Sequence, residues 1–167
     1  MPARVISVIG GSDSSPENLE HAERVGAEIA KRGVILVCGG LGGVMEAVCR
    51  GAKKEGGQTL GILPTDNKEH ANEFVDIAIP TGFGYARNFL VAKTGDAVIA
   101  IDGSAGTLSE MAIAWFSDKP IVALVPTGGW AARLAGEKID DRRTDKIYAA
   151  VTPEEAVDKV FEVLNWK

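Results

Sequence analysis

Glycine-rich turns interrupt the sequence three times, each between an apolar run and a segment with helical periodicity. They begin at Gly10, Gly39 and Gly103. The apolar run before each turn is short and rich in β-branched residues, which is typical of a buried strand. Strands that alternate with helices in this way form parallel sheets with helices on both faces. Because the carboxyl ends of parallel strands meet at one edge, we expect all three turns to share one rim.

The same alternation continues along the whole chain and predicts a three-layer α/β fold with a mainly parallel sheet of about six or seven strands. Nothing in the sequence resembles a linker, so we expect one domain over residues 1–167. Strands are predicted over residues 5–9, 34–38, 59–63, 74–79, 96–101, 120–125 and 147–151, helices over 16–32, 44–55, 85–93, 106–116 and 153–164, and a long charged connection over 126–146.

Charge and composition exclude several classes of protein. The net charge of −5 argues against a general nucleic-acid-binding surface. The apolar run near the N-terminus is too short for a signal peptide or a membrane span, so a cytoplasmic protein without membrane contact is expected. Cys38 and Cys49 are too few for a disulfide framework and are expected to be buried thiols. His21 and His70 are isolated, so no metal site is predicted.

The stretch from Ala100 to Glu110 is predicted to cradle a phosphate. Two glycines and small residues let the backbone approach a ligand closely, and free N–H groups at a helix start attract an anion. Glu110 falls one turn into that helix, facing the same cleft. Thr107-x-x-Glu110 also matches a capping box, in which the carboxylate only satisfies backbone N–H groups. Both interpretations of Glu110 remain open from the residues alone.

Arg87 falls in the first turn of a predicted helix, where a cation meets the unfavourable end of the helix dipole. It follows a strand, so it also lies on the carboxyl rim, where an arginine can hold a carboxylate or phosphate bidentately. The alternative is a solvated surface arginine. Two familiar phosphate motifs are absent, Gly-x-x-x-x-Gly-Lys-[Ser/Thr] and Gly-x-Gly-x-x-Gly, which argues against an NTPase and a dinucleotide dehydrogenase.

Four motifs in order resemble the Lonely-guy (LOG) superfamily, also described as lysine decarboxylase-like, although decarboxylation is not expected here. They are Gly10–Ser12, Gly39–Ala47, Arg87-Asn88 and Gly103–Glu110. The resemblance implies a Rossmann-like fold, a homodimer or higher homo-oligomer, and, for the hydrolase members, cleavage of the N-glycosidic bond of cytokinin or purine nucleoside 5′-monophosphates. The hydrolase members carry the signature Pro-Gly-Gly-x-Gly-Thr-x-x-Glu and an upstream Arg-Lys pair. This sequence differs from that pattern at three positions: Asp102 replaces the proline, Ser104 the second glycine and Asn88 the lysine.

Gly-Gly-Val-Met-Glu-Ala and Arg-Asn are more similar to the branch of the molybdenum-cofactor carrier proteins, which bind a phosphate-bearing pterin. The expected function is therefore binding of a nucleotide or pterin, as a carrier or weak hydrolase, with a nucleoside 5′-monophosphate phosphoribohydrolase as the alternative. No cofactor is required; a nucleotide, phosphate or molybdenum cofactor is the expected bound group. The candidate catalytic residues are Arg87 and Glu110, and the candidate ligand-binding residues are Gly10, Gly11, Ser12, Gly39, Gly40, Gly42, Gly43, Glu46, Asn88, Gly103, Ser104, Ala105, Gly106 and Thr107.

Apolar side chains beyond those that a single core requires suggest self-association through the helices beside the cleft, with Leu90, Val91 and Trp115 as examples. Phe89 is predicted to point inward. Trp130 follows two glycines, Gly128 and Gly129, and is interpreted equally well as a lid or as a surface tryptophan. Met45 and Met111 are predicted core residues, because each falls on an apolar helix face.

Overall fold

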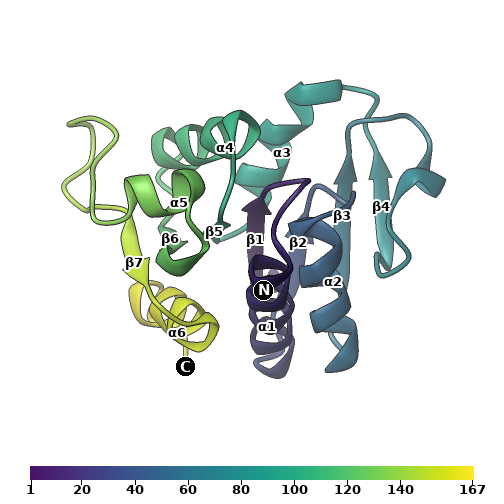
Figure 1. Cartoon of the computed structure of the whole chain (residues 1–167), viewed down its shortest axis with the longest axis horizontal. Helices are drawn as coiled ribbons and strands as arrows, with labels where there is room; N and C mark the ends of the chain where they lie inside the picture. Colours follow the sequence, from purple (N-terminus) through teal and green to yellow (C-terminus); the bar gives the residue numbers. More distant parts are fainter.

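The computed structural model describes residues 1–167 and contains a seven-stranded sheet in which every neighbouring pair of strands is parallel (Figure 1). The strand order is β4-β3-β2-β1-β5-β6-β7, so the order reverses between β1 and β5. The strands are β1 Val5–Gly10, β2 Ile35–Cys38, β3 Thr59–Leu63, β4 Ile77–Pro80, β5 Ala97–Ile101, β6 Ile121–Leu124 and β7 Tyr148–Ala150. The predicted α/β fold with a parallel sheet is confirmed.

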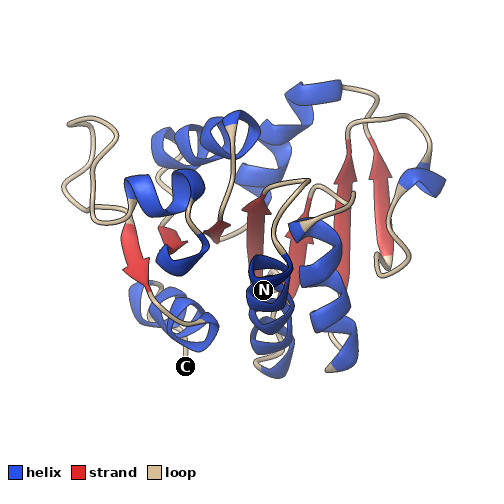
Figure 2. Ribbon diagram, viewed as in Figure 1, coloured by secondary structure: helices blue, strands red, loops and turns tan.

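Helices cover both faces of the sheet, and Figure 2 shows the red strands among the blue helices. One core joins the sheet to α1, α2 and α6, and a second core joins it to α3, α4 and α5. The helices are α1 Pro16–Lys31, α2 Val44–Lys54, α3 Arg87–Thr94, α4 Ala105–Phe116, α5 Gly129–Leu134 and α6 Pro153–Val163, with short 3₁₀ turns η1 Lys68–His70, η2 Gly84–Ala86 and η3 Val125–Thr127.

The two cores follow the two-residue period of the strands. In β5, Ile99 and Ile101 face the α1–α2–α6 core, whereas Val98 and Ala100 face the α3–α4–α5 core. All five residues of β5 are buried. A central parallel strand is therefore apolar on both faces, which explains the unbroken β-branched runs in the sequence.

Two glycines allow α1 and α2 to touch backbone to backbone. A Cβ on Gly26 would lie 1.9 Å from the carbonyl oxygen of Val48, and a Cβ on Gly51 would lie 1.8 Å from that of Glu23. Real side-chain atoms do not approach so closely, so both positions require glycine. This contact fixes α2, and with it the glycine-rich turn from which α2 starts, against the rest of the sheet.

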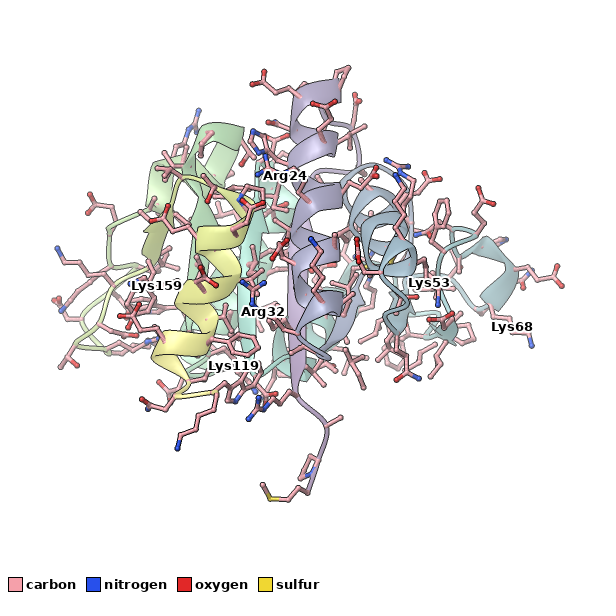
Figure 3. All side chains as sticks on the ribbon, turned by 90° about the horizontal axis from the view of Figure 1, so that it is seen from below. Arg24, Arg32, Lys53, Lys68, Lys119 and Lys159 are labelled. Atoms are coloured by element: carbon pink, nitrogen blue, oxygen red, sulfur yellow. The ribbon has the colours of Figure 1, made fainter.

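Ion pairs join α1 to α6 along their exposed sides. Arg24 contacts Glu154 at 2.8 Å and Arg32 contacts Asp158 at 2.6 Å. Figure 3 shows Arg24 and Arg32 between the purple helix α1 and the yellow helix α6. Exposed pairs of this kind each contribute at most about 1 kcal/mol, so packing rather than charge holds the two helices together.

The region 126–146, predicted as a long charged connection, includes secondary structure for which the sequence predicts no element. It contains η3 and the short helix α5. Arg143, which is 8% exposed, anchors the remainder. It pairs with Asp145 at 2.7 Å, donates to the carbonyls of Trp115 and Lys119, and lies over the Trp115 ring.

The apolar residues on α3 and α4 are distributed differently from the prediction. Val91 and Trp115 belong to the core rather than to a contact surface, and Phe89 is 45% exposed rather than inward. Met45 and Met111 are buried, as predicted. The large apolar side chains left exposed near these helices are Phe83, Tyr85, Phe89 and Phe116.

We predict that Gly26→Ala destabilises the protein although alanine favours helices. The new methyl group must displace the Val48 carbonyl, and overpacking costs about 1–3 kcal/mol or more, against a propensity gain of about 1 kcal/mol. Urea unfolding should give a lower midpoint. Gly106→Ala is the matched control, because this helical glycine has only one atom within 4.0 Å of a built Cβ. An equal effect of the two substitutions would contradict close α1–α2 packing.

Candidate functional site

A cavity of about 1080 Å³ opens at the carboxyl edge of the sheet. It lies beyond the ends of β1 and β5, where the strand order reverses, which is where parallel sheets bind ligands. In Figure 1 the carboxyl ends of β1 and β3 point to the top of the view, toward the start of α3. The candidate residues that line the cavity are Gly10, Gly11, Ser12, Gly39, Arg87, Asn88, Ser104, Ala105, Gly106, Thr107 and Glu110.

Five candidate ligand-binding residues do not line the cavity. Gly40, Gly43 and Gly103 have left-handed backbones, at φ of 77°, 64° and 107°, and they shape the turns instead. The Val44 N–H that follows Gly43 donates to the carbonyl of Gly11 at 3.0 Å and so fixes the start of α2 on the first turn. Gly42 and Glu46 also lie outside the lining.

The predicted cradle corresponds to the first turn of α4. The helix begins at Ala105, and the N–H groups of Ala105, Gly106 and Thr107 have no acceptor within the chain. Such free N–H groups, together with the helix dipole, attract an anion. A Cβ on Gly106 would have only the Asn88 amide, at 4.0 Å, nearby, so the backbone of Gly106 faces open space.

The back of the cradle is held by the region around α5. The N–H groups of Trp130 and Ala131 donate to the carbonyls of Gly103 and Asp102 at 3.1 and 3.2 Å. The Asp102 N–H donates to the Thr127 hydroxyl at 2.8 Å. The Trp130 side chain does not line the cavity, so it is not a lid in this structure. Trp130 contacts the turn through its backbone N–H. These bonds hold the carbonyl side of the turn away from the cavity.

Asp102 joins the first glycine-rich turn to the cradle. The Ser14 hydroxyl donates to its carboxylate at 2.7 Å. Asp102 has a left-handed backbone, at φ of 55°, which is uncommon for a residue with a side chain. Its carboxylate does not line the cavity. The negative charge at this position is therefore used to fix a loop.

Glu110 is the one carboxylate that lines the cavity, and it has no hydrogen-bond partner within the chain. The capping-box interpretation does not hold, because α4 starts before Thr107 and its N-terminus has no side-chain cap. Glu110 is 7% exposed. Burial raises its pKa to about 8, and the Arg87 charge opposes the rise only in part. At neutral pH the side chain is mainly a neutral carboxylic acid.

Arg87 is buried, at 9% exposure, so the interpretation as a solvated surface arginine is wrong. Its Nε donates to the carbonyl of Ile62 at 2.9 Å, and one Nη donates to that of Gly39 at 3.3 Å. The other Nη donates to the Asn88 side-chain oxygen. Burial lowers the pKa of Arg87, while the nearby Glu110 raises it. The guanidinium thus fixes the ends of β2 and β3 at the cavity wall.

Asn88 continues this chain of hydrogen bonds to the cradle. Its amide donates to the Ser109 hydroxyl at 3.1 Å, and that hydroxyl donates to the carbonyl of Gly106 at 2.6 Å. Sequence reasoning missed Ser109, because a serine inside a predicted helix carries no motif of its own. It also missed Tyr85 and Phe89 as lining residues, although their proximity to Arg87 on the rim was available as a signal.

The fold and the cavity define an α/β protein in which the start of a helix, with unbonded N–H groups, borders a cavity at the switch point of a parallel sheet. Residues 3–157 match the SLOG cluster4 family, and the chain belongs to that family. The resemblance to the LOG superfamily, with relatives among the molybdenum-cofactor carriers, is therefore confirmed.

Individual relatives carry different names. An uncharacterized protein from Archaeoglobus fulgidus is 46% identical over 121 residues, which are 72% of this chain and 80% of that protein. A cytokinin riboside 5′-monophosphate phosphoribohydrolase from Mycobacterium tuberculosis is 39% identical over 127 residues, with coverage of 70% and 67%. The molybdenum cofactor binding protein from Rippkaea orientalis has a similar structure, with a TM-score of 0.87, 34% identity, and coverage of 98% and 99%.

None of the helices combines the length and the apolar character needed to cross a lipid bilayer.

We predict that Glu110 makes the protein less stable as the pH rises from about 5 to 8. The folded protein holds a proton on Glu110 up to a pKa of about 8, whereas the unfolded chain releases it near the ordinary value of 4.5. The folded state therefore binds more protons in this window, and the free energy of unfolding falls by about 1.4 kcal/mol per unit of pKa shift. The penalty is complete above pH 8.

Thermal unfolding from pH 5 to 9 checks this, with Glu110→Gln as the control that cannot ionise. The melting temperature of Glu110→Gln, relative to that of the unmodified protein, should increase steadily up to pH 8. Parallel pH profiles would contradict the raised pKa.

Proposed function

We propose that this protein binds a phosphomonoester ligand of the nucleotide or pterin class, with the phosphate at the first turn of α4. The observation that carries the proposal is the set of unbonded N–H groups of Ala105, Gly106 and Thr107 at the cavity wall. The Thr107 side chain is 3% exposed, and its hydroxyl has no hydrogen-bond partner within the chain. A phosphate would supply acceptors for all of these groups.

The charges around the cavity suit an anion at neutral pH. Among the residues that line the cavity, Arg87 is the one basic residue and Glu110 the one acidic residue. Because the pKa of Glu110 is raised to about 8, its carboxyl group is mainly neutral and repels a phosphate little. The buried guanidinium of Arg87 then leaves a positive field. Asp102, which would oppose an anion, is turned toward Ser14.

Similar proteins support both kinds of ligand. The Rippkaea orientalis protein, whose structure matches nearly the whole chain, is described as binding the molybdenum cofactor. The phosphate of such a pterin fits the helix-terminus cradle. The Mycobacterium tuberculosis relative is named for a nucleoside 5′-monophosphate substrate, which carries the same phosphate group. The shared requirement is a phosphomonoester next to a heteroaromatic ring.

The cradle is tested by Gly106→Val and Thr107→Ala, with AMP titrated calorimetrically. Gly106→Val should abolish binding, because its side chain projects into the space that the phosphate needs. Thr107→Ala should weaken binding by about 1 kcal/mol, or by up to about 3 kcal/mol if the hydroxyl bonds the charged phosphate. Unchanged AMP affinity in a folded Gly106→Val protein would contradict the proposal.

A second candidate function is hydrolysis of the N-glycosidic bond of a nucleoside 5′-monophosphate, which consumes water and releases the free base and ribose 5-phosphate. The unpartnered Glu110 favours it, because a buried carboxyl group with a pKa near neutrality suits proton transfer. As the acid, Glu110 protonates the leaving base; once ionised, it orients water or stabilises the positive ribosyl centre. Arg87 offsets the resulting charge. A single carboxylate is less than the usual pair.

Glu110→Gln separates binding from turnover. The substitution keeps the size of the side chain and removes its acid. If the protein is a hydrolase, the rate of adenine release from AMP should fall by several orders of magnitude, while the affinity for AMP is retained. Chromatography of the released adenine measures this rate. Hydrolysis as fast as in the parent protein would remove Glu110 from catalysis and leave the binding site.

Self-association stays a prediction and is part of this proposal. Phe116, at the end of α4, is 47% exposed and offers apolar surface for a second copy. Val91 and Trp115, which were expected to contribute, are fully used in the core.

A further inference from the structure

An exposed tyrosine stands at the edge of the cavity. Tyr85 is 90% exposed although it is among the residues that line the cavity, and Phe89, also in the lining, is 45% exposed. The Tyr85 ring packs on no other aromatic ring or cation, and its hydroxyl has no hydrogen-bond partner within the chain. Large aromatic side chains gain free energy when their apolar area is covered, so this ring has a face available for a ligand.

The backbone that carries Tyr85 is held firmly on its N-terminal side. The N–H groups of Thr81, Gly82 and Gly84 donate to the carbonyls of residues 63–65, at 3.2, 2.9 and 2.9 Å. Gly82 and Gly84 have left-handed backbones, at φ of 67° and 57°, which lets the chain turn tightly before η2. On the C-terminal side, the side chain of Arg87 is bonded to Ile62 and Gly39. The tyrosine is thus a free side chain on a fixed support.

Tyr85 and the first turn of α4 line the same cavity. Tyr85 precedes Asn88 by one turn of the η2–α3 segment, a rise of roughly 5 to 6 Å. The Asn88 amide in turn lies next to Gly106 of the cradle, 4.0 Å from a Cβ built there. Tyr85 is therefore connected to the first turn of α4 through Asn88, and both border the same cavity.

Several apolar side chains also contribute to the lining of the cavity. Leu41, Met45, Pro64, Phe89 and Ile113 all line it. Such walls suit an uncharged planar ring and give a sugar hydroxyl nothing to bond. The cavity thus combines the unbonded N–H groups at the start of α4 with apolar and aromatic side chains.

We infer that Tyr85, with Phe89 beside it, is a stacking platform for the heteroaromatic ring of the phosphorylated ligand. The proposed function already limits the ligand to phosphates that carry a heteroaromatic ring, and this inference names the side chains that make such a ligand bind better than a sugar phosphate. The inference rests on the proposed function for the phosphate end. It assigns a role to two further lining residues of the same cavity, Tyr85 and Phe89.

Two ligands and three variants test the platform. AMP and ribose 5-phosphate share the phosphate and the sugar, and only AMP has a ring. Both are titrated calorimetrically in the Glu110→Gln background, so that AMP is not consumed. Base stacking on an aromatic side chain corresponds to a factor of about 5 to 150 in affinity. Tyr85→Ala should therefore weaken AMP by about 5- to 150-fold and leave ribose 5-phosphate unchanged, and Tyr85→Phe should restore AMP binding.

Phe116→Ala is the matched control, because Phe116 is an exposed aromatic residue outside the cavity lining. It should change neither affinity. Suppose that both ligands bind the Glu110→Gln protein and that adding Tyr85→Ala leaves AMP affinity unchanged. The stacking platform is then contradicted, and the proposed phosphate site at α4 is not affected. If neither ligand binds the Glu110→Gln protein or the unmodified protein, the proposed function itself fails. If Tyr85→Ala weakens both ligands equally and lowers the mass measured by light scattering, Tyr85 serves contact between copies and the inference is overturned.

Discussion

A buried guanidinium is costly unless its N–H groups find acceptors, and Arg87 finds two of them at the ends of two strands. Its partners are the carbonyls of Ile62 and Gly39 and the side chain of Asn88. Each bond to a charged donor contributes about 1.5–3 kcal/mol, and leaving such a group unpaired costs more. The turns after β2 and β3 and the start of α3 are therefore fixed relative to one another. Through Asn88 and Ser109, the same chain of bonds reaches the cradle.

The cradle is supported from two sides by contacts of different kinds. Side-chain bonds from α3 hold the cavity side of α4, while the N–H groups of Trp130 and Ala131 hold the carbonyls behind it. This division explains why residues so far apart in sequence converge on Gly103–Thr107. With its carbonyls occupied, the turn presents donors to the cavity. Preorganised donors of this kind need no rearrangement when an anion arrives.

The sequence predicts the sheet well because its signals are local. Parallel strands buried on both faces carry unbroken apolar runs, and glycine-rich turns separate them from the helices, so β3 is predicted at its observed bounds, Thr59–Leu63. The features that the sequence does not predict, or predicts wrongly, depend on tertiary contacts. The helix α5 has six residues and begins with glycine, so its stability comes from packing rather than from propensity. Phe89 fits a helical face in the sequence, yet that face meets the cavity mouth.

In the candidate site, too, the sequence predicts some features and leaves others undecided. Motif spacing locates the glycine-rich turns, Arg87 and Glu110, because these positions depend on the order of strands and helices. Spacing cannot separate a capping carboxylate from a free one, since both occur at Thr107-x-x-Glu110. Only the observed start of α4 at Ala105 decides that question. Likewise the sequence cannot tell which glycines face the ligand and which, like Gly103, only permit the turn.

Binding and hydrolysis make different demands on this one cavity. Binding needs the amide donors of the first turn of α4 and a neutral carboxyl group beside the phosphate, and burial of Glu110 provides the second condition. Hydrolysis needs the same carboxyl group to lose or give a proton during each turnover, which a pKa of about 8 permits. Arg87 cannot easily turn toward the reacting atoms, because its N–H groups are bonded to the ends of β2 and β3. In our proposal one scaffold suits either activity, and the proton on Glu110 is the group whose transfer hydrolysis needs and binding does not.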